Sequence, residues 1–403
     1  MQWRVDSRVL INRSLFVEAV FMTNSIVLRA LGAVVAGLVL TVGASFEAGA
    51  QINPAVLPVS GPLSKQSMSR LLLTDAARVG NRVVAVGDRG YIVYSDSNGE
   101  SWQRAMTPPN IPLLTAVFFL DDKTGWAVGH DSTILTSTDQ GQSWTKAFSA
   151  ADEQKPLMDI TFLDANTGFA VGAYGAFYAT TDGGKNWTSR KIFETAKVAL
   201  PKAAAKKNKY QSVGSGKIAD AGIDDKPGGK SGEEDKHINA ITKLGDHKLF
   251  VAGEAGLLAK SDDGGKTWVK IVSPYKGSFF GAIQAQDGAL LIYGLRGRIY
   301  RSTDPQLANW KQIQNKTVAS LMGATRLPDG ALVLAGLSGT VLISRDSGAS
   351  FSLLSSGSTK AISAPLLGAP NALLLVGEAG VRDLLLAANV NAPVAPAAAR
   401  GKP

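Results

Sequence analysis

The chain has 403 residues, a formal net charge of +9, 43 glycines and no cysteine. The missing cysteines exclude disulfides, thiolate catalysis and Cys-ligated metals, and the low charged fraction of 19% argues against a long disordered chain. Many glycines with few charges favour a globular body of short strands and turns.

The N-terminal segment predicts export. Residues 30–42 form an apolar run of 13 that follows Arg29 and precedes the Ala-x-Ala sequence ending at Ala50. Such a run is too short to span a bilayer, so we interpret residues 1–50 as a signal peptide cleaved after Ala50; the alternative is an uncleaved anchor. A start at Met22 would give a signal of ordinary length. We therefore expect an exported, periplasmic protein.

A repeat organises the remainder of the chain. The stretch GEAGLLAKSDDGGKTW from Gly253 recurs in varied form from six other glycines, which are Gly87, Gly129, Gly172, Gly294, Gly336 and Gly377. The leading glycines are 42, 43, 81, 41, 42 and 41 residues apart, so seven units repeat with one insertion. A period of this length with strand-like units predicts a β-propeller of seven four-stranded antiparallel blades over residues 51–387.

Each unit contains an apolar first strand, a second strand ending at the leading glycine, a third strand, and a Ser/Thr-x-Asp-x-Gly-x-x-Trp hairpin called an Asp-box. The aspartate is expected to accept backbone hydrogen bonds in its own turn, and the tryptophan to cover the hairpin. We assign this structural role to Asp96, Asp139, Asp182, Asp263, Asp304, Asp346, Trp102, Trp144, Trp187, Trp268 and Trp310.

The seventh unit lacks an Asp-box and a fourth strand. We expect residues 55–62 to supply that strand, so that the two ends of the propeller meet in blade seven. The tail 388–403, rich in Ala and Pro, is expected to be disordered. Residues 190–237, between the third and fourth units, form a Lys-rich insertion that we also expect to be disordered, either as a solvated loop or as a recognition arm for an acidic partner.

Function on a propeller is expected in the connections between second and third strands, because loops on a rigid scaffold vary freely. The candidate partner-binding residues there are Arg89, His130, Tyr174, Glu254, Arg296, Arg298 and Glu378. An arginine pair from blades one and five would clamp a carboxylate or an acidic loop; the alternative is a set of solvated turn residues. The histidines lack metal-ligand spacing and no phosphate loop is present, so no metal or cofactor is predicted.

The repeat, with DKTGWAVG at residues 122–129 and ANTGFAVG at 165–172, resembles the photosystem II stability/assembly factor family over residues 65–385. That resemblance implies a seven-bladed, exported, non-catalytic protein that binds newly made membrane-protein subunits through an arginine-rich patch, with Arg89 and Arg296 at matching positions. We therefore expect a protein client in a membrane complex, and no nucleic acid. The alternative is a sialidase-like or other glycan-binding or glycoside-hydrolysing propeller, which would require paired carboxylates and, for sialic acid, three converging arginines.

Overall fold

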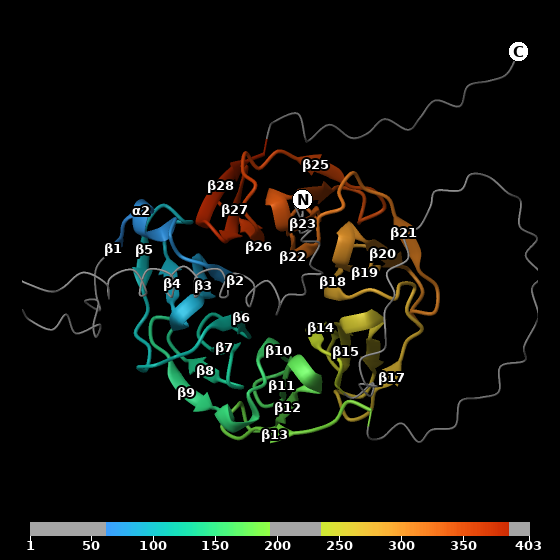
Figure 1. Ribbon diagram of the computed structural model, residues 1–403, viewed down its shortest axis with the longest axis horizontal. Coiled ribbons are helices and arrows are strands. Elements are labelled where there is room, and N and C mark those ends of the chain that lie inside the picture. Colours follow the sequence, from blue (N-terminus) through green and yellow to red (C-terminus); the bar gives the residue numbers. More distant parts are fainter. Residues whose placement is uncertain (1–61, 194–234, 387–403) are drawn as a thin grey trace, which may run out of the picture.

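The computed structural model describes residues 62–193 and 235–386. These form seven antiparallel sheets arranged as the blades of a closed propeller around a central axis (Figure 1). A polar cavity lies at the centre between first strands and is here called the channel. The seven-bladed all-β architecture predicted from the repeat is therefore confirmed. The predicted signal peptide 1–50, most of the insertion 190–237 and the tail 388–403 lie outside the described residues.

Strands follow chain order outward in each blade. The first strands, which line the channel, are β2 (Leu73–Val79), β6 (Leu114–Phe119), β10 (Leu157–Phe162), β14 (Ile238–Gly245), β18 (Phe279–Gln284), β22 (Leu321–Arg326) and β26 (Ile362–Leu367). The second strands are β3 (Arg82–Gly87), β7 (Gly125–Gly129), β11 (Gly168–Gly172), β15 (Lys248–Gly253), β19 (Leu290–Gly294), β23 (Leu332–Gly336) and β27 (Ala372–Gly377).

The third strands are β4 (Ile92–Ser95), β8 (Ile134–Ser137), β12 (Phe177–Thr180), β16 (Leu258–Ser261), β20 (Ile299–Ser302), β24 (Val341–Ser344) and β28 (Gly380–Leu385). The outer strands are β5 (Trp102–Arg104), β9 (Thr145–Phe148), β13 (Thr188–Ser189), β17 (Val269–Lys270), β21 (Lys311–Ile313) and β25 (Ser352–Leu354). Within the described residues, blade seven thus has three strands and each other blade has at least four.

The hydrophobic core is divided into seven clusters, one at each junction between neighbouring blades. Between blades two and three, for example, the buried ring of Trp126 stacks on Phe162 with a centroid distance of 3.6 Å. Burying one such large side chain contributes about 1.5–3 kcal/mol, so the junctions supply most of the stability of this cysteine-free ring.

A bulge near the start of every first strand helps to join the blades. The pairing register shifts after the first residue of all seven strands, as between Leu114 and Ala116. In blade two the residue at the bulge is Thr115, whose hydroxyl donates to the carbonyl of Leu157 in blade three at 2.6 Å. Equivalent inter-blade bonds come from Thr74, Asn239 and Ser363.

Of the segment 55–62, which is expected to complete blade seven, the structure describes only Pro62. Pro62 belongs to β1 (Pro62–Leu63), which pairs with β5 as a fifth strand of blade one rather than completing blade seven. The physical reason is that Leu63 packs with Trp102 in the cluster between blades seven and one. Residues 55–61 lie outside the described residues.

The described segment before β2 nevertheless links the two end blades. The one-turn helix α2 (Lys65–Met68) lies beside blade seven (Figure 1), and Met68 is buried in the same cluster as Val376 and Val381. On the channel side, the Ser363 hydroxyl donates to the Leu73 carbonyl at 3.2 Å. The Arg78 guanidinium of blade one also donates to the Leu367 carbonyl of blade seven. Packing and these hydrogen bonds therefore close the ring between blades seven and one.

Candidate binding face

One face of the propeller, here called the tip face, consists of the connections from second to third strands. Five of these are short 3-10 segments, which are η2 (Asp88–Gly90), η4 (Ala173–Gly175), η6 (Glu254–Gly256), η7 (Leu295–Gly297) and η8 (Leu337–Gly339). The middle residue of each is left-handed, as at Arg89 with φ 53° and Arg296 with φ 57°. The glycine that follows lies close to the connection that leads to the next blade. A Cβ on Gly297, for example, would lie 2.6 Å from the Thr317 carbonyl in the connection after β21. The middle residue therefore stands at the end of a fixed turn.

The middle residues of these turns are the ones that reach solvent. The Arg89 side chain is 81% exposed, Tyr174 is 54% exposed, and Arg296 is exposed as well. Arg298 follows the glycine of its turn and is also exposed. These four predicted residues are thus available for contact with another molecule.

The predicted acidic residues also form bonds within the scaffold. Glu254 and Glu378 are each half-buried, and their carboxylates accept the backbone N–H of His237 and of Ala361, each at 3.2 Å. Glu378 also accepts the Lys360 ammonium at 2.7 Å. These carboxylates brace the connection that leads into the first strand of their own blade.

The structure does not bring Arg89 and Arg296 together. They lie on blades one and five, which are separated by blades six and seven on the shorter way around the ring. Arg89 also has its own carboxylate, because Asp88 Oδ2 lies 3.5 Å from Arg89 Nε. The two arginines are therefore not on neighbouring blades, and their clamp on one carboxylate stays a prediction.

Four exposed cations, here called the blade-five patch, lie on the tip of blade five and on the connections into and out of that blade; they are Lys276, Arg296, Arg298 and Lys316. The connection containing Lys316 is held against the tip because Asn315 Nδ2 donates to the Gly297 carbonyl at 2.8 Å. Arg298 places its guanidinium 6.0 Å from the ring centre of Tyr275, next to Lys276. Within residues 62–193 and 235–386 no ion-pair partner is described for any of the four, so their charge is uncompensated there.

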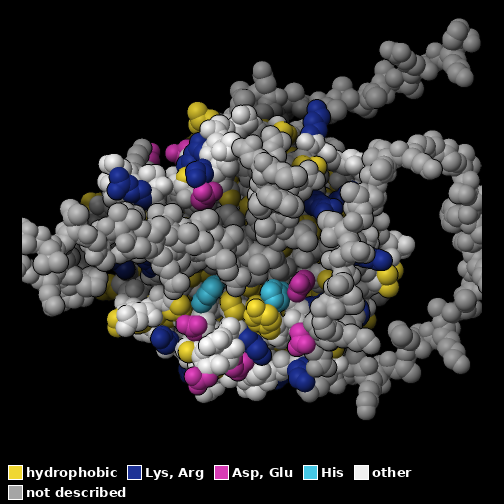
Figure 2. Space-filling view, viewed as in Figure 1, with side chains coloured by type: hydrophobic (Ala, Val, Ile, Leu, Met, Phe, Trp, Pro, Cys, Tyr) yellow, Lys and Arg dark blue, Asp and Glu magenta, His cyan; other side chains and the backbone are white. Residues whose placement is uncertain are grey.

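Blade three carries an aromatic group on the same face. The ring of Tyr174 meets that of His237 edge to face at 4.8 Å, and Gly175 N–H donates to the Lys236 carbonyl at 3.1 Å. His130, on the tip of blade two, is half-buried. Figure 2 shows imidazole, apolar, acidic and basic side chains distributed around this face rather than one uniform surface. The C-terminal end of the insertion therefore joins the fold beside Tyr174.

The Asp-boxes lie on the opposite face with the turns between first and second strands, as shown by the bond from Gln140 N–H to the Lys123 carbonyl. Asp139 accepts the Ser143 N–H at 2.9 Å, the Ser143 hydroxyl at 2.5 Å and the Ser137 hydroxyl at 2.8 Å. The same pattern of turn bonds surrounds Asp182, Asp263, Asp304 and Asp346. These five aspartates therefore hold their own hairpins together through turn bonds.

The assignment of Asp96 is wrong. Ser97 occupies the aspartate position of blade one and accepts the Ser101 N–H at 2.8 Å, whereas Asp96 forms a two-pronged ion pair with Arg82 at 2.7 and 2.9 Å. Arg82 also donates to the Gln140 carbonyl of blade two. Asp96 therefore helps to position an arginine that spans two blades.

The covering tryptophans are placed as predicted. Trp102, Trp144, Trp187 and Trp268 are buried, and Trp310 packs against the cluster between blades four and five. The indole N–H of four of them donates to the carbonyl three residues earlier, as from Trp144 to Gly141 at 3.0 Å. These four rings are thus bonded to their own hairpins, whereas Trp268 is held by burial alone.

Hydrogen bonding keeps the Asp-box carboxylates ionised. The Asn186 side chain and backbone lower the pKa of Asp182 to about 2. Burial alone would raise the pKa of Asp139, but the bonds from Ser143 and Ser137 outweigh it and lower the pKa. Carboxylates with low pKa values that are used up in turn bonds are poor general acids.

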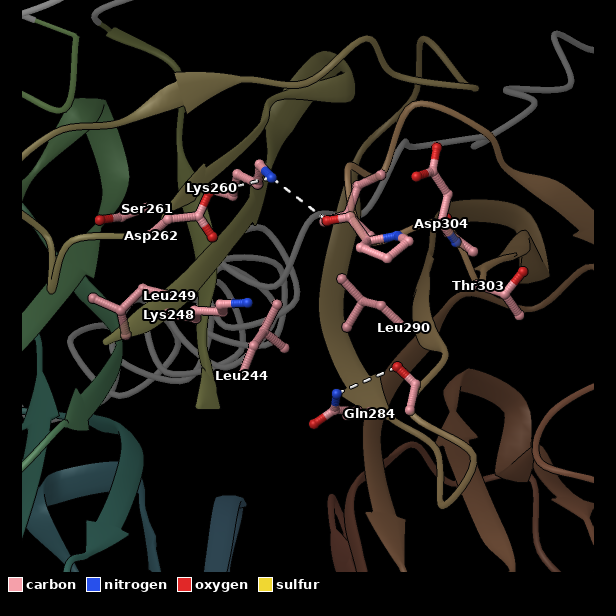
Figure 3. A pocket seen from close by; sticks show the side chains of 14 residues that line it. Leu244, Lys248, Leu249, Lys260, Ser261, Asp262, Gln284, Leu290, Thr303 and Asp304 are labelled. Atoms are coloured by element: carbon pink, nitrogen blue, oxygen red, sulfur yellow. Dashed lines mark hydrogen bonds and ion pairs between the residues drawn. The ribbon is translucent and has the colours of Figure 1, made fainter. Parts of the chain in front are cut away.

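A pocket of about 200 Å³ opens between blades four and five on the Asp-box side (Figure 3). Lys260 extends from β16 across this gap, and its ammonium contacts the Pro305 carbonyl, the Gln306 side chain at 3.2 Å and Asp262 at 3.2 Å. These contacts satisfy the charge, so the lysine joins the blades and is not presented to a ligand.

The channel contains two carboxylates, Asp75 and Asp159, in a polar cavity of about 150 Å³. Asp75 accepts the Val117 N–H of blade two and Asp159 the Ile241 N–H of blade four, each at 3.0 Å. Across the part of the chain that the structure describes, no three His, Cys, Asp or Glu residues are grouped to hold a metal ion. The same residues contain no helix long and apolar enough to cross a membrane.

The fold and its two faces define a seven-bladed Asp-box propeller with a rigid loop face. The chain belongs to the photosynthesis system II assembly factor YCF48 family, whose model matches residues 90–177 and 149–324 and so spans more than half of the chain. This confirms the resemblance drawn from the repeat. No curated protein sequence matches the chain.

Solved structures share the fold at low identity. "YCF48 bound to D1 peptide" is 17% identical with a TM-score of 0.55, covering 81% of this chain and 96% of that one. YCF48 from Cyanidioschyzon merolae is 15% identical with a TM-score of 0.55, covering 78% and 95%. A GH74 xyloglucanase from Xanthomonas campestris is 14% identical with a TM-score of 0.52, covering 80% and 53%. At such identities the likeness shows the architecture alone.

Proposed function

We propose that this protein is an exported, non-catalytic assembly factor that binds an acidic segment of a membrane-protein client on its tip face, at the blade-five patch. The observation that carries the proposal is the uncompensated charge of Lys276, Arg296, Arg298 and Lys316, with Arg298 over the half-buried ring of Tyr275. Arginine is suited to carboxylates because its planar guanidinium donates two parallel hydrogen bonds.

The family supports a protein partner, since a YCF48 structure with 17% identity is described as bound to a D1 peptide. The rigid ring supports it physically, because turns fixed by packing lose little conformational freedom on binding. Export, expected from residues 1–50, would place the tip face where it meets the outer parts of membrane proteins. The insertion, which rejoins the fold at Lys236 on this face, would act as a second contact arm.

The test uses a labelled D1 peptide titrated into the purified protein, with fluorescence anisotropy as the readout. The double variant Arg296→Glu/Arg298→Glu should weaken binding about tenfold or more, equivalent to about 1.4 kcal/mol. Arg89→Glu is the matched control, because that arginine is equally exposed but already has Asp88 beside it. Equal loss in both variants would remove the blade-five patch from the proposal.

Failure of the wild type to bind this peptide would exclude a D1-like client. Cross-linking from position 296 in membrane extracts, followed by mass spectrometry, then identifies the bound segment, and an uncharged or basic segment would contradict the proposal. The glycoside hydrolase alternative rests on fold likeness to the xyloglucanase. Release of reducing sugar from xyloglucan, abolished by substituting Asp75 or Asp159, would favour that alternative.

A further inference from the structure

A groove of about 640 Å³ lies on the tip face between blades five and six. Lys316 and Thr317 line it from the connection that leaves blade five, and Thr340 lines it from the tip of blade six. Leu353 lines it from the outer strand β25. Pockets of about 300–1,000 Å³ are typical of ligand sites. Because Lys316 also belongs to the blade-five patch, the groove and the patch form one continuous surface.

The connections that leave successive blades can be compared, because each packs on the glycine of its own tip in the same way. A Cβ on Gly256 of blade four would lie 2.5 Å from the Tyr275 carbonyl. A Cβ on Gly297 of blade five would lie 2.6 Å from the Thr317 carbonyl. Tyr275 and Thr317 therefore occupy the same position in two successive connections.

Large side chains fill the space between the tips of blades four and five. The ring of Tyr275 lies 6.0 Å from that of Phe279 and 6.3 Å from that of Tyr300. The guanidinium of Arg298, which follows the tip glycine of blade five, lies 6.0 Å from the centre of the Tyr275 ring. A ring and a guanidinium thus cover this junction on the tip face.

Small side chains stand at the matching positions between blades five and six. Thr317 takes the position of Tyr275, and Thr340, which follows the tip glycine of blade six, takes that of Arg298. The two threonine hydroxyl oxygens lie 3.5 Å apart. The groove is therefore the space that a ring and a guanidinium fill at the preceding junction.

Leu353 gives the groove an apolar wall. It pairs across the strands with Leu342, which is fully buried in the cluster between blades five and six. Residues opposite one another on paired strands share a face, so Leu353 faces blade five. It is nevertheless 51% exposed. An apolar side chain placed in the groove would cover it.

We propose that this groove binds an aromatic side chain of the client, directly beside the acidic residue that pairs with Lys316. The inference rests on the proposed function and adds a second recognition element to it. An aromatic ring fits because the groove replaces the place of the Tyr275 ring and has Leu353 as its wall. The acidic neighbour follows from charge complementarity with the exposed Lys316, whose ammonium is also attracted to the face of a ring.

Two labelled peptides test the proposal, Gly-Phe-Glu-Glu-Phe-Gly and Gly-Ala-Glu-Glu-Ala-Gly. They have the same charge, and a ring on each side of the glutamates allows either direction of the peptide to place one ring in the groove. Fluorescence anisotropy with the purified protein should show about tenfold tighter binding of the phenylalanine peptide. Equal affinities would overturn the proposal.

Three variants locate the preference without changing charge. Thr317→Tyr puts the residue of blade four into the groove, and Leu353→Ser removes the apolar wall; each should reduce the preference for phenylalanine to about twofold or less. Val269→Ser is the matched control, because Val269 is an apolar residue of an outer strand, is 58% exposed and does not line the groove. It should keep the tenfold preference. A preference that survives both Thr317→Tyr and Leu353→Ser would place the ring elsewhere and overturn the proposal.

The outcome separates this inference from the proposed function. If both peptides bind equally to the wild type and Arg296→Glu/Arg298→Glu weakens both, the acidic client stands and only the aromatic residue is refuted. If neither peptide binds, the acidic client and the groove are refuted together. A dimer in sedimentation that is lost in Leu353→Ser would identify a second copy as the occupant. Tighter binding of both peptides after deletion of residues 194–234 would identify that segment of the chain instead, and either result would overturn the proposal.

Discussion

The Asp-box hairpin of blade two offers the sharpest test of the scaffold. Asp139→Ala removes the acceptor of three hydrogen bonds, from the Ser143 N–H, the Ser143 hydroxyl and the Ser137 hydroxyl. At about 1 kcal/mol net for each bond, the free energy of unfolding should fall by about 3 kcal/mol. The hairpin is held by these bonds and by the bond from the Trp144 indole to Gly141. Gly141 packs closely on blade one, because a Cβ built on it would lie 3.0 Å from the Val84 side chain. Loosening the hairpin should therefore also weaken the junction between blades one and two.

Asp139→Asn removes the negative charge of the side chain but keeps its size and shape. The amide oxygen still accepts the Ser143 N–H, and the Ser143 hydroxyl can turn to accept from the amide nitrogen. We expect a loss of only about 1 kcal/mol for this variant. Asp122→Ala is a control, because this exposed carboxylate on the same face makes no hydrogen bond within the described residues.

Urea unfolding followed by tryptophan fluorescence measures all three variants, provided that the slope of the transition stays constant. The expected order of stability is wild type, then Asp122→Ala within about 0.5 kcal/mol, then Asp139→Asn, then Asp139→Ala. If Asp139→Ala is no less stable than Asp122→Ala, the Asp-box does not stabilise the blade and the reasoning fails.

Three further predictions concern pH, glycine and the inter-blade bonds. The pKa of Asp182 is lowered from 3.8 to about 2, so the ionised carboxylate stabilises the fold above the unfolded pKa, and this stabilisation is lost as pH falls toward 2. Thermal midpoints measured from pH 5 to 2 should therefore drop less steeply for Asp182→Asn than for wild type. Gly265→Ala places a Cβ 2.3 Å from the Phe169 ring at φ +81°, and should lower the free energy of unfolding in urea by about 1–3 kcal/mol. The loss should exceed that of Gly264→Ala, where the nearest contact of the added Cβ is 3.6 Å. Equal losses would show that backbone strain, and not the contact with Phe169, causes the effect. Thr115→Val deletes the bond to Leu157 and should cost about 1–2 kcal/mol, and a neutral result in calorimetry would show that the bulge bonds do not join the blades.

Much of the fold could be predicted because the information is repeated. Leading glycines at near-constant spacing define seven units. The pattern within a unit predicts the order of its strands, and the Asp-box motif predicts the hairpin and its covering tryptophan. Local chemistry suffices for these features, since a turn aspartate and a glycine act within a few residues of one another. The assignment of Asp96 departs from this spacing, because Ser95, Gly99 and Trp102 place Ser97 at the aspartate position, and the bonds of Ser97 agree with that position.

The candidate site depended on distances that no local pattern contains. The sequence identified the tip residues, but the ring decided that Arg89 and Arg296 are apart, that Asp88 accompanies Arg89, and that Lys276 and Lys316 join Arg296 from the adjoining connections. Likewise, the sequence placed Glu254 on the tip, but only the structure shows that its carboxylate accepts the His237 N–H. The sequence by itself determined the number, order and internal chemistry of the blades, because these arise from neighbours along the chain. Only the tertiary structure decided how the ring closes and which cations remain uncompensated, because both depend on residues that are far apart along the chain and meet through packing between blades.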